Sequence, residues 1–165
     1  MVGGDAGAFG ACRDLFDALA RAAFHVGPVG AGARMKLATN LVLGLNRAAL
    51  AEGLAFARSI GLDPAQTLEI LRAGAAASRV ADTKGPRMVA GDFAPEARLS
   101  QHLKDVRLIL AEARRAGAET PLSLAHLGLL EAAEAAGYGE ADNSAVIRAF
   151  DPARGRAEAC REDRA

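Results

Sequence analysis

The chain is poor in the side chains that nucleic-acid and membrane surfaces need. It has 165 residues, no tryptophan and one tyrosine, and aromatic residues make up only 4%, so a base-stacking surface is not expected. Basic and acidic side chains balance at 20 each, which leaves no net charge to attract a polyanion or an anionic membrane. No apolar run reaches the roughly 18 residues that a membrane-spanning helix needs. We therefore expect neither nucleic acid nor a membrane as a partner.

Cysteine is also scarce, and the metal-binding residue types are scattered. Cys12 and Cys160 are far apart and form no CxxC motif, which indicates two free thiols in a reducing cytoplasm. His25, His102 and His126 have no carboxylate or cysteine cluster at ligand spacing, so no metal site is expected. The first residues, MVGGDAGAFG, are not a basic segment followed by an apolar one, as a secretory signal would be. The expected location is the cytoplasm.

Alanine is abundant and β-branched residues are few, which favours helix nearly everywhere. Apolar spacings of three and four residues, with proline, glycine and capping signals between them, set the expected boundaries. The pattern predicts a break at Gly85-Pro86 and a poorly ordered tail after Pro152. The expected helices cover residues 7–22, 31–60, 64–74 (with Asp63 as N-cap), 99–116 (ended by Gly117), 121–137, and a short last one over 144–150 capped by Asp142 or Asn143.

The first 26 residues differ from the rest. Their pattern predicts the end of a strand, a helix, and a second β-prone piece over 24–26. A segment of this size is too small to bury a sheet of its own. We interpret this segment as the end of a larger α/β domain. The expected division is a remnant over 1–29, a helical domain over 30–150 that forms a bundle around one long central helix, and a tail over 151–165. The fold class is mostly α.

One lysine stands out in the segment RMKLATNLVL. The chain has three lysines against seventeen arginines, and Lys36 precedes Asn40 by one helical turn on an otherwise apolar helix. An all-round apolar helix is typical of a buried one, where an isolated ammonium is costly. A desolvated lysine can lose its proton near neutral pH, unlike arginine, and can act as an acid or base. The alternative is a lysine whose stem lies along a partly buried helix and whose charge reaches water.

Two further features remain open between a structural and a functional interpretation. Lys104 lies near the start of a helix, where the helix dipole favours an acid, so it either meets an anion or is a solvated surface charge. The glycines of GPVGAG have the order GxxGxG rather than GxGxxG, and no acidic residue follows a second strand. They indicate a tight turn into the helix, although exposed N–H groups there can still meet a carboxylate.

Four blocks together resemble a known family. GPVGAGARMKLATN, EGLAFARSIGLD, HLKDVRLILAEARRAGAETPL and GYGEADNSAVI are similar, in order and spacing, to the C-terminal helical domain of the β-hydroxyacid dehydrogenases. The nearest branch is 3-hydroxyisobutyrate dehydrogenase and its relatives, and the resemblance runs from Met1 to about Phe150. It implies a homo-oligomeric enzyme that interconverts a β-hydroxy acid and its carbonyl form with NAD or NADP. The segment before residue 30 would then be a Rossmann-domain remnant.

The resemblance also implies a role for individual residues. Lys36 corresponds to the family's catalytic lysine, a general acid or base on the substrate oxygen, and Asn40 to the asparagine that helps to hold the substrate. Thr39 departs from the pattern, because the family often has two adjacent asparagines. The glycines next to the substrate carboxylate and the lysine that contacts the cofactor correspond to Gly30, Gly32 and Lys104.

One departure bears on activity. Family members begin with a dinucleotide-binding domain that carries GxGxxG and a serine-glycine-glycine substrate loop, and this sequence has neither. MVGGD resembles the residues just after that loop. We therefore expect a truncated chain with little or no dehydrogenase activity on its own. The alternatives are a non-catalytic helical module for self-association, and a branch that acts on a phosphorylated sugar acid, for which no basic cluster is evident.

Overall fold

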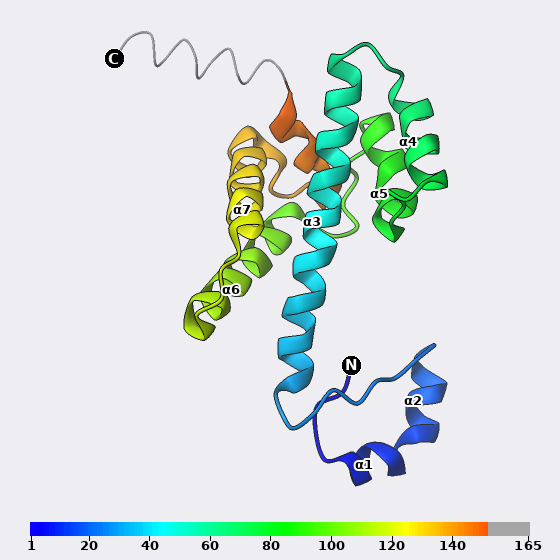
Figure 1. The fold of residues 1–165 in the computed structure, drawn as a ribbon, viewed down its shortest axis with the longest axis vertical. Coiled ribbons are helices and arrows are strands. Elements are labelled where there is room, and N and C mark those ends of the chain that lie inside the picture. Colours follow the sequence, from blue (N-terminus) through cyan, green and yellow to red (C-terminus); the bar gives the residue numbers. More distant parts are fainter. Residues whose placement is uncertain (152–165) are drawn as a thin grey trace. The chain divides into compact units, whose positions relative to one another are not determined.

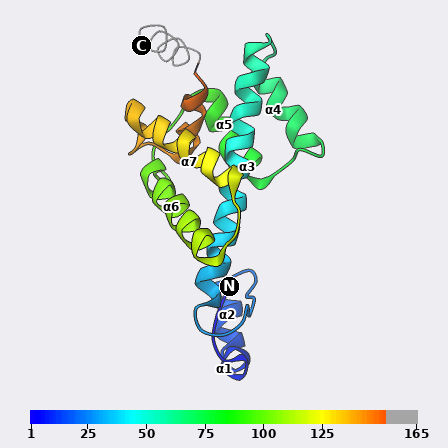
Figure 2. The same ribbon diagram turned by 60° about the vertical axis from the view of Figure 1, so that its left-hand side comes forward.

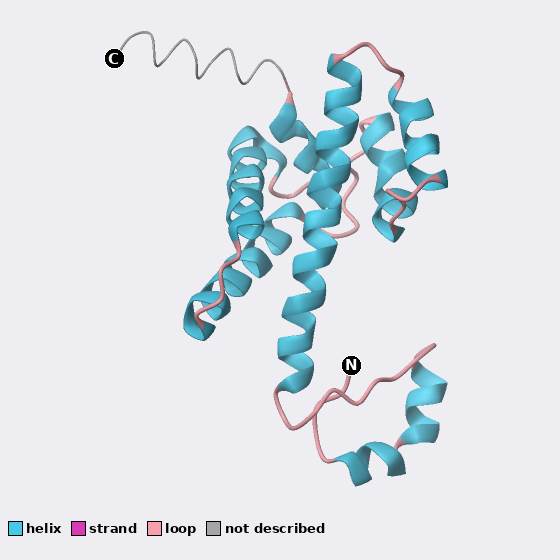
Figure 3. Ribbon diagram, viewed as in Figure 1, coloured by secondary structure: helices cyan, strands magenta, loops and turns pink. Residues whose placement is uncertain are grey.

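The computed structural model describes residues 1–151, and the expected tail after Pro152 lies outside the described residues. Within them the chain is mostly helical, as Figure 3 shows, and its β-type pairing is limited to isolated bridges. This confirms the mostly α fold class. The elements in chain order are α1 (Ala6–Ala11), α2 (Arg13–Leu19), α3 (Ala31–Ser59), α4 (Pro64–Ala73), α5 (Arg79–Ala90), α6 (Leu99–Ala116), α7 (Pro121–Ala133), a π-helical turn η1 (Glu134–Tyr138) and a 3-10 helix η2 (Asn143–Phe150).

The chain forms two compact units, Met1–Val42 and the part from Leu43 onward, and the boundary falls inside α3. The domain boundary predicted from the sequence, between residues 29 and 30, lies at the start of α3 and stays a prediction.

The first unit holds the β-type pairing that the sequence suggests. Val2 and His25 form a parallel bridge, in which the Val2 amide donates to Phe24 O (2.8 Å) and the Val26 amide donates to Val2 O (2.9 Å). The single helix predicted over 7–22 is wrong, because the chain breaks at Cys12 into α1 and α2. Two glycines weaken α1, and neither short helix buries a residue that would hold a longer helix straight.

The second unit packs four helices and the 3-10 helix around the C-terminal half of α3. In Figure 1 the α4–α5 pair and the α6–α7 pair lie on different sides of this half of the helix, and Figure 2 shows the same helices turned by 60°. Leu54 of α3, Leu103 of α6 and Leu130 of α7 are each at most 1% exposed and belong to one hydrophobic cluster. The long central helix of the prediction is therefore present, over 31–59 rather than 31–60.

Several predicted helix ends are confirmed, and one predicted break is not. The Asp63 carboxylate accepts the Gln66 amide at 2.8 Å as the N-cap of α4, and Gly117 ends α6 with φ of +67°. The break at Gly85-Pro86 is wrong, because α5 continues through it. Gly85 is buried directly against Leu68, where any larger side chain would clash, and this packing outweighs the hydrogen bond that proline removes.

Candidate functional site

The glycines before α3 are explained mainly by close backbone packing. Gly30 has φ of +89°, a conformation that favours glycine. A Cβ on Gly32 would lie 3.2 Å from the Gly3 amide nitrogen, and a Cβ on Gly3 would lie 2.8 Å from the Gly32 nitrogen. The Gly4 amide also donates to Gly27 O at 2.8 Å. The start of the chain is thus held against the first turn of α3, which agrees with the tight-turn interpretation.

Lys36 and Asn40 lie one turn apart on the N-terminal half of α3. Lys36 is exposed, Asn40 is half-buried, and the Thr39 hydroxyl donates to Lys36 O at 3.0 Å. The expectation that this half of the helix is buried all round is wrong for the described chain, because Met35 is 41% exposed and Val42 is 56% exposed. The reason is that the first unit is small, with Ala31, at 9% exposure, as its one buried residue.

Lys104 lies in the second unit, in the second turn of α6, and is exposed. The first turn of α6 carries no acidic residue, and Arg98 at the N-cap makes no side-chain capping bond. Lys36 and Asn40 belong to the first unit, so a common cleft that contains Lys104 stays a prediction.

A buried carboxylate, which the sequence indicated only as a helix cap, organises the start of α6. Asp142 is fully buried and caps η2, as predicted. Its Oδ1 accepts the Ser144 amide (3.0 Å) and hydroxyl (2.7 Å), and its Oδ2 accepts Lys84 Nζ (2.9 Å) and the Ala97 amide (3.1 Å). Burial alone would raise the pKa of Asp142, but these hydrogen bonds hold it well below its usual range. Lys84 is the one lysine for which the sequence predicted no role.

A second polar cluster lies inside the helical core, where the sequence pattern gave no signal for it. Arg47 of α3, His102 of α6 and His126 of α7 are at most 6% exposed, and the two imidazole rings are 5.2 Å apart. Burial lowers the pKa of Arg47 to about 10. Burial, together with the charge of Arg47 and the neighbouring His126, lowers the pKa of His102 to about 3. Burial and Arg47 lower the pKa of His126 to about 4, so both imidazoles are neutral at neutral pH.

Gly44 makes this packing possible. A Cβ at this position would lie 2.7 Å from His102 Nε2 and 2.7 Å from His126 Cε1. Only a residue without a side chain lets both rings reach the surface of α3.

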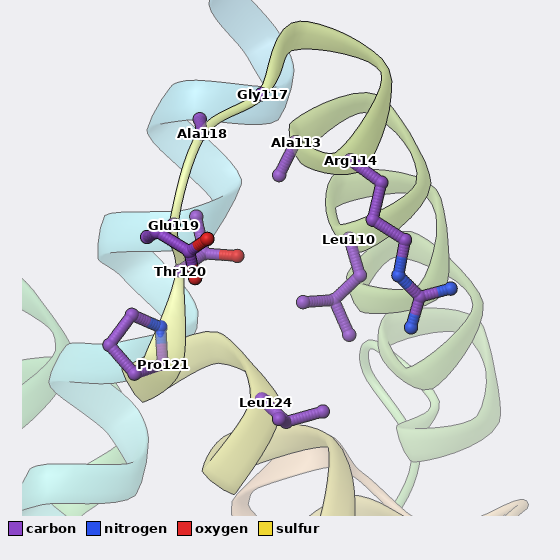
Figure 4. A pocket seen from close by; sticks show the side chains of 9 residues that line it. All are labelled: Leu110, Ala113, Arg114, Gly117, Ala118, Glu119, Thr120, Pro121 and Leu124. Carbon is purple, nitrogen blue, oxygen red and sulfur yellow. The ribbon is translucent and has the colours of Figure 1, made fainter.

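The second unit also has an open groove between α6, the connection that follows it, and α7, shown in Figure 4. Its volume is about 410 Å³. Leu110, Ala113 and Leu124 form an apolar lining, and Arg114 and Glu119 contribute one charge of each sign. None of the site residues predicted from the sequence lines this groove.

Within residues 1–151, no group of three or more histidine, cysteine or acidic side chains could hold a metal ion. No helix in this part of the chain is long and apolar enough to cross a membrane. Cys12 is a free, exposed thiol, and Cys160 lies outside the described residues.

The chain matches, over residues 30–150, the family described as the NAD-binding domain of NADP-dependent 3-hydroxyisobutyrate dehydrogenase. This match takes in most of the 165 residues, so the chain belongs to that family. The family description names the cofactor class that the resemblance implied, NAD or NADP.

Curated relatives extend the comparison. The chain is 32% identical over 156 residues to glyoxylate/succinic semialdehyde reductase 2 of Arabidopsis thaliana, and this match covers 94% of the chain and 44% of that protein. It is 32% identical over 151 residues to 2-hydroxy-3-oxopropionate reductase of Escherichia coli, and this match covers 92% of the chain and 52% of the relative. It is also 34% identical over 150 residues to the cytokine-like nuclear factor N-PAC of Homo sapiens, 91% of this chain and 27% of that protein. The chain thus spans about half the length, or less, of these relatives.

Solved structures share the fold. The 3-hydroxyisobutyrate dehydrogenase of Salmonella typhimurium has a TM-score of 0.83 at 28% identity, covering 88% of this chain and 52% of its own. The Mycobacterium tuberculosis 3-hydroxyisobutyrate dehydrogenase with L-serine has a TM-score of 0.77 at 28% identity, covering 90% of this chain and 53% of its own. Both likenesses support the mostly helical fold.

Proposed function

We propose that the chain is the helical half of a cytoplasmic, homo-oligomeric NAD(P)-dependent dehydrogenase that interconverts a β-hydroxy acid and its carbonyl form. Lys36 is the general acid or base, Asn40 holds the substrate, and Gly30 and Gly32 lie next to the substrate carboxylate. Lys104 binds the cofactor. These 165 residues span about half the length of the reductases they match, and on their own they have little or no dehydrogenase activity. Membership of the family and the relatives named as reductases support this proposal.

The observation that carries the proposal is the pairing of Lys36 with Asn40 in the matched region. The two side chains lie one turn apart on α3, so both can reach the same small molecule. Lys36 is exposed, which leaves its amine accessible to a substrate. An ammonium can donate a proton to a carbonyl oxygen as it is reduced, and the neutral amine can take a proton from an alcohol as it is oxidised.

The test is a chimera that joins this chain to the part of the E. coli reductase that it does not match. We expect the chimera to oxidise or reduce a β-hydroxy acid couple and the chain alone to show no measurable turnover. In the chimera, Lys36→Ala should lower kcat by roughly 10²–10⁴-fold, as expected for loss of a general acid–base group, with the cofactor Kd unchanged.

Arg34→Ala is the matched control, because Arg34 is another exposed cation half a turn away on the same helix. It should leave turnover close to that of the unmodified chimera. Turnover that survives Lys36→Ala, or that falls equally in Arg34→Ala, would refute the acid–base role.

The second candidate is a non-catalytic helical module for self-association. One observation favours it: the N-PAC relative is named as a nuclear factor rather than as an enzyme. A folded chimera that binds the cofactor but turns over no hydroxy acid, while the chain still self-associates, would favour this candidate over the first.

A further inference from the structure

The core of the second unit contains a positive charge whose hydrogen bonds are incomplete. Arg47 of α3 is 3% exposed, and its Nε and Nη1 atoms have no hydrogen-bond partner among the described residues. Burial lowers the pKa of Arg47 to about 10, which still leaves the guanidinium charged at neutral pH. A buried charge without hydrogen bonds is costly, so these two N–H groups need an acceptor.

Two imidazole nitrogens beside α3 also have no partner. His102 Nε2 of α6 and His126 Nε2 of α7 are buried, and neither has a hydrogen-bond partner within residues 1–151. The two ring centroids are 5.2 Å apart. Both rings meet α3 at Gly44, since His102 Nε2 and His126 Cε1 each lie 2.7 Å from the position of a Cβ built on that glycine. The Nε2–Cε1 edge of His102 and the Cε1 corner of His126 therefore face α3.

Arg47 lies on the face of α3 that the two rings contact, because it is three residues after Gly44. Side chains on an α-helix lean toward its N-terminus, so the side chain of Arg47 leans back toward the turn of Gly44. The charge of Arg47 acts on both rings, since it adds to the effect of burial in lowering the pKa of His102 and of His126. The unpartnered nitrogens of these three side chains thus lie together, and we call the three residues the Arg47 cluster.

The one nearby carboxylate whose charge acts on Arg47 cannot supply the acceptor. Asp142 raises the pKa of Arg47, but its Oδ1 already accepts two hydrogen bonds from Ser144. Its Oδ2 accepts hydrogen bonds from Lys84 Nζ and the Ala97 amide, and the Lys84 ammonium offsets its charge at 2.9 Å. The Arg47 cluster therefore keeps a positive charge and N–H groups that the surrounding side chains do not bond.

A small anion meets both needs. It can accept hydrogen bonds from the guanidinium and from each neutral imidazole that carries its proton on Nε2. A water molecule would also accept these bonds, but it would leave the buried charge uncompensated. The packing is tight, because not even a methyl group fits at Gly44. This favours a single-atom anion over phosphate or an organic acid.

We propose that Arg47, His102 and His126 form a binding site for one chloride ion inside the helical core. The ion accepts hydrogen bonds from Arg47 and from at least one of the rings, and it links α3, α6 and α7. This site lies outside the proposed catalytic machinery, and no part of the inference depends on dehydrogenase activity.

The first test is urea unfolding of the full chain at neutral pH, in sodium chloride and in sodium gluconate of equal ionic strength. Gluconate is too large for the site and controls for screening. Starting from chloride-free buffer, chloride should raise the equilibrium constant for folding about tenfold for each tenfold increase in its concentration above the Kd, because it binds the folded chain alone. Gluconate should not do so. Equal responses to the two salts would overturn the proposal.

A matched pair of substitutions assigns the response to the Arg47 cluster. Arg47→Met removes the charge from the core and should abolish the difference between the two salts. Arg58→Met is the control, because Arg58 is an exposed arginine near the end of the same helix, and it should keep the full difference. Circular dichroism should show both variants as helical as the unmodified chain. A chloride response that persists unchanged in Arg47→Met would exclude this site.

The second test locates the ion directly and needs no substitution, so it decides the matter even if Arg47→Met fails to fold. Crystals of the unmodified chain grown in sodium bromide should show an anomalous bromine peak in contact with Arg47 and with a ring nitrogen of His102 or His126. Water alone at this position, or bromide bound only at the molecular surface, would refute the proposal whatever the salt dependence of stability.

Discussion

Acidification should destabilise the chain well before its carboxylates titrate, because His102 and His126 are neutral in the folded core. The pKa values of about 3 and about 4 in the folded chain lie below the roughly 6.5 of an unfolded histidine. As the pH falls below about 6.5, the unfolded chain binds these two protons first, so the equilibrium shifts toward unfolding. The contribution of the neutral histidines to stability is therefore present above that pH and is lost as the pH falls toward the folded pKa values.

The size of the effect follows from the two pKa shifts. By about pH 5 each histidine should lower the free energy of unfolding by about 2 kcal/mol. Protonation stabilises the unfolded chain by about 1.4 kcal/mol per histidine for each pH unit below the pKa of the unfolded histidine. Together they should remove about 4 kcal/mol, a large share of the roughly 5–15 kcal/mol that stabilises an ordinary domain. Asp142 does not interfere, since its lowered pKa keeps it ionised through this window.

The assay is urea unfolding of the full chain, followed by far-ultraviolet circular dichroism between about pH 7 and about pH 5. His102→Asn and His126→Asn should each halve the loss of unfolding free energy between these pH values, and the double variant should remove most of it. His25→Asn is the control, because His25 lies exposed in the first unit, and it should keep the full loss.

Two results would refute the reasoning. One is an unmodified chain whose unfolding free energy changes by less than about 1 kcal/mol over this range, which would mean that the two histidines are not held neutral by the fold. The other is a His25 variant that loses the pH dependence as fully as the core variants do.

Three further predictions concern packing, the buried carboxylate and the cofactor. Gly44→Ala should destabilise the chain by about 1–3 kcal/mol, because its Cβ would press on two imidazoles. Gly53→Ala in the same helix, where a Cβ meets nothing within 4 Å, should stabilise the chain by about 0.5–1 kcal/mol. Equal effects of the two substitutions in thermal unfolding would contradict this prediction. Asp142→Asn should cost about 3 kcal/mol, since an amide N–H would face the Lys84 ammonium, and denaturant unfolding that shows no loss would remove its structural role. In the chimera, Lys104→Ala should weaken cofactor binding about 10-fold in a calorimetric titration with helicity unchanged, and an unaltered Kd would end that assignment.

Local signals in the sequence predicted most helix ends because capping is local chemistry. Asp63 followed by proline, and Gly117 after an amphipathic run, act through the few backbone groups next to them. One wrong prediction, the break at Gly85-Pro86, arose where distant packing decided the outcome. Gly85-Pro86 stays helical because of its fit against Leu68, which lies in another helix and has no signature near the proline.

The candidate site shows the same limit. Lysines in an arginine-rich chain drew attention to Lys36 and Lys104, and the same signal was available for Lys84, whose Nζ meets buried Asp142 at 2.9 Å. No comparable signal existed for Arg47 and His126. The sequence of α7 is apolar on nearly every side of the helix, so its periodicity does not indicate which face packs against the core.

The Asp142 carboxylate ties together segments that are made far apart in time as the chain is synthesised. Its hydrogen bond to the Ala97 amide spans 45 positions, and the one to Lys84 spans 58. Backbone bonds reinforce the link, since the Leu99 amide donates to Ala141 O at 2.9 Å. The beginning of the helix that carries Lys104 therefore reaches its final form only when residues beyond 140 have arrived. A stop codon shortly before Asp142 would leave that helix unanchored at its first turn, even though every residue of the helix itself had been translated.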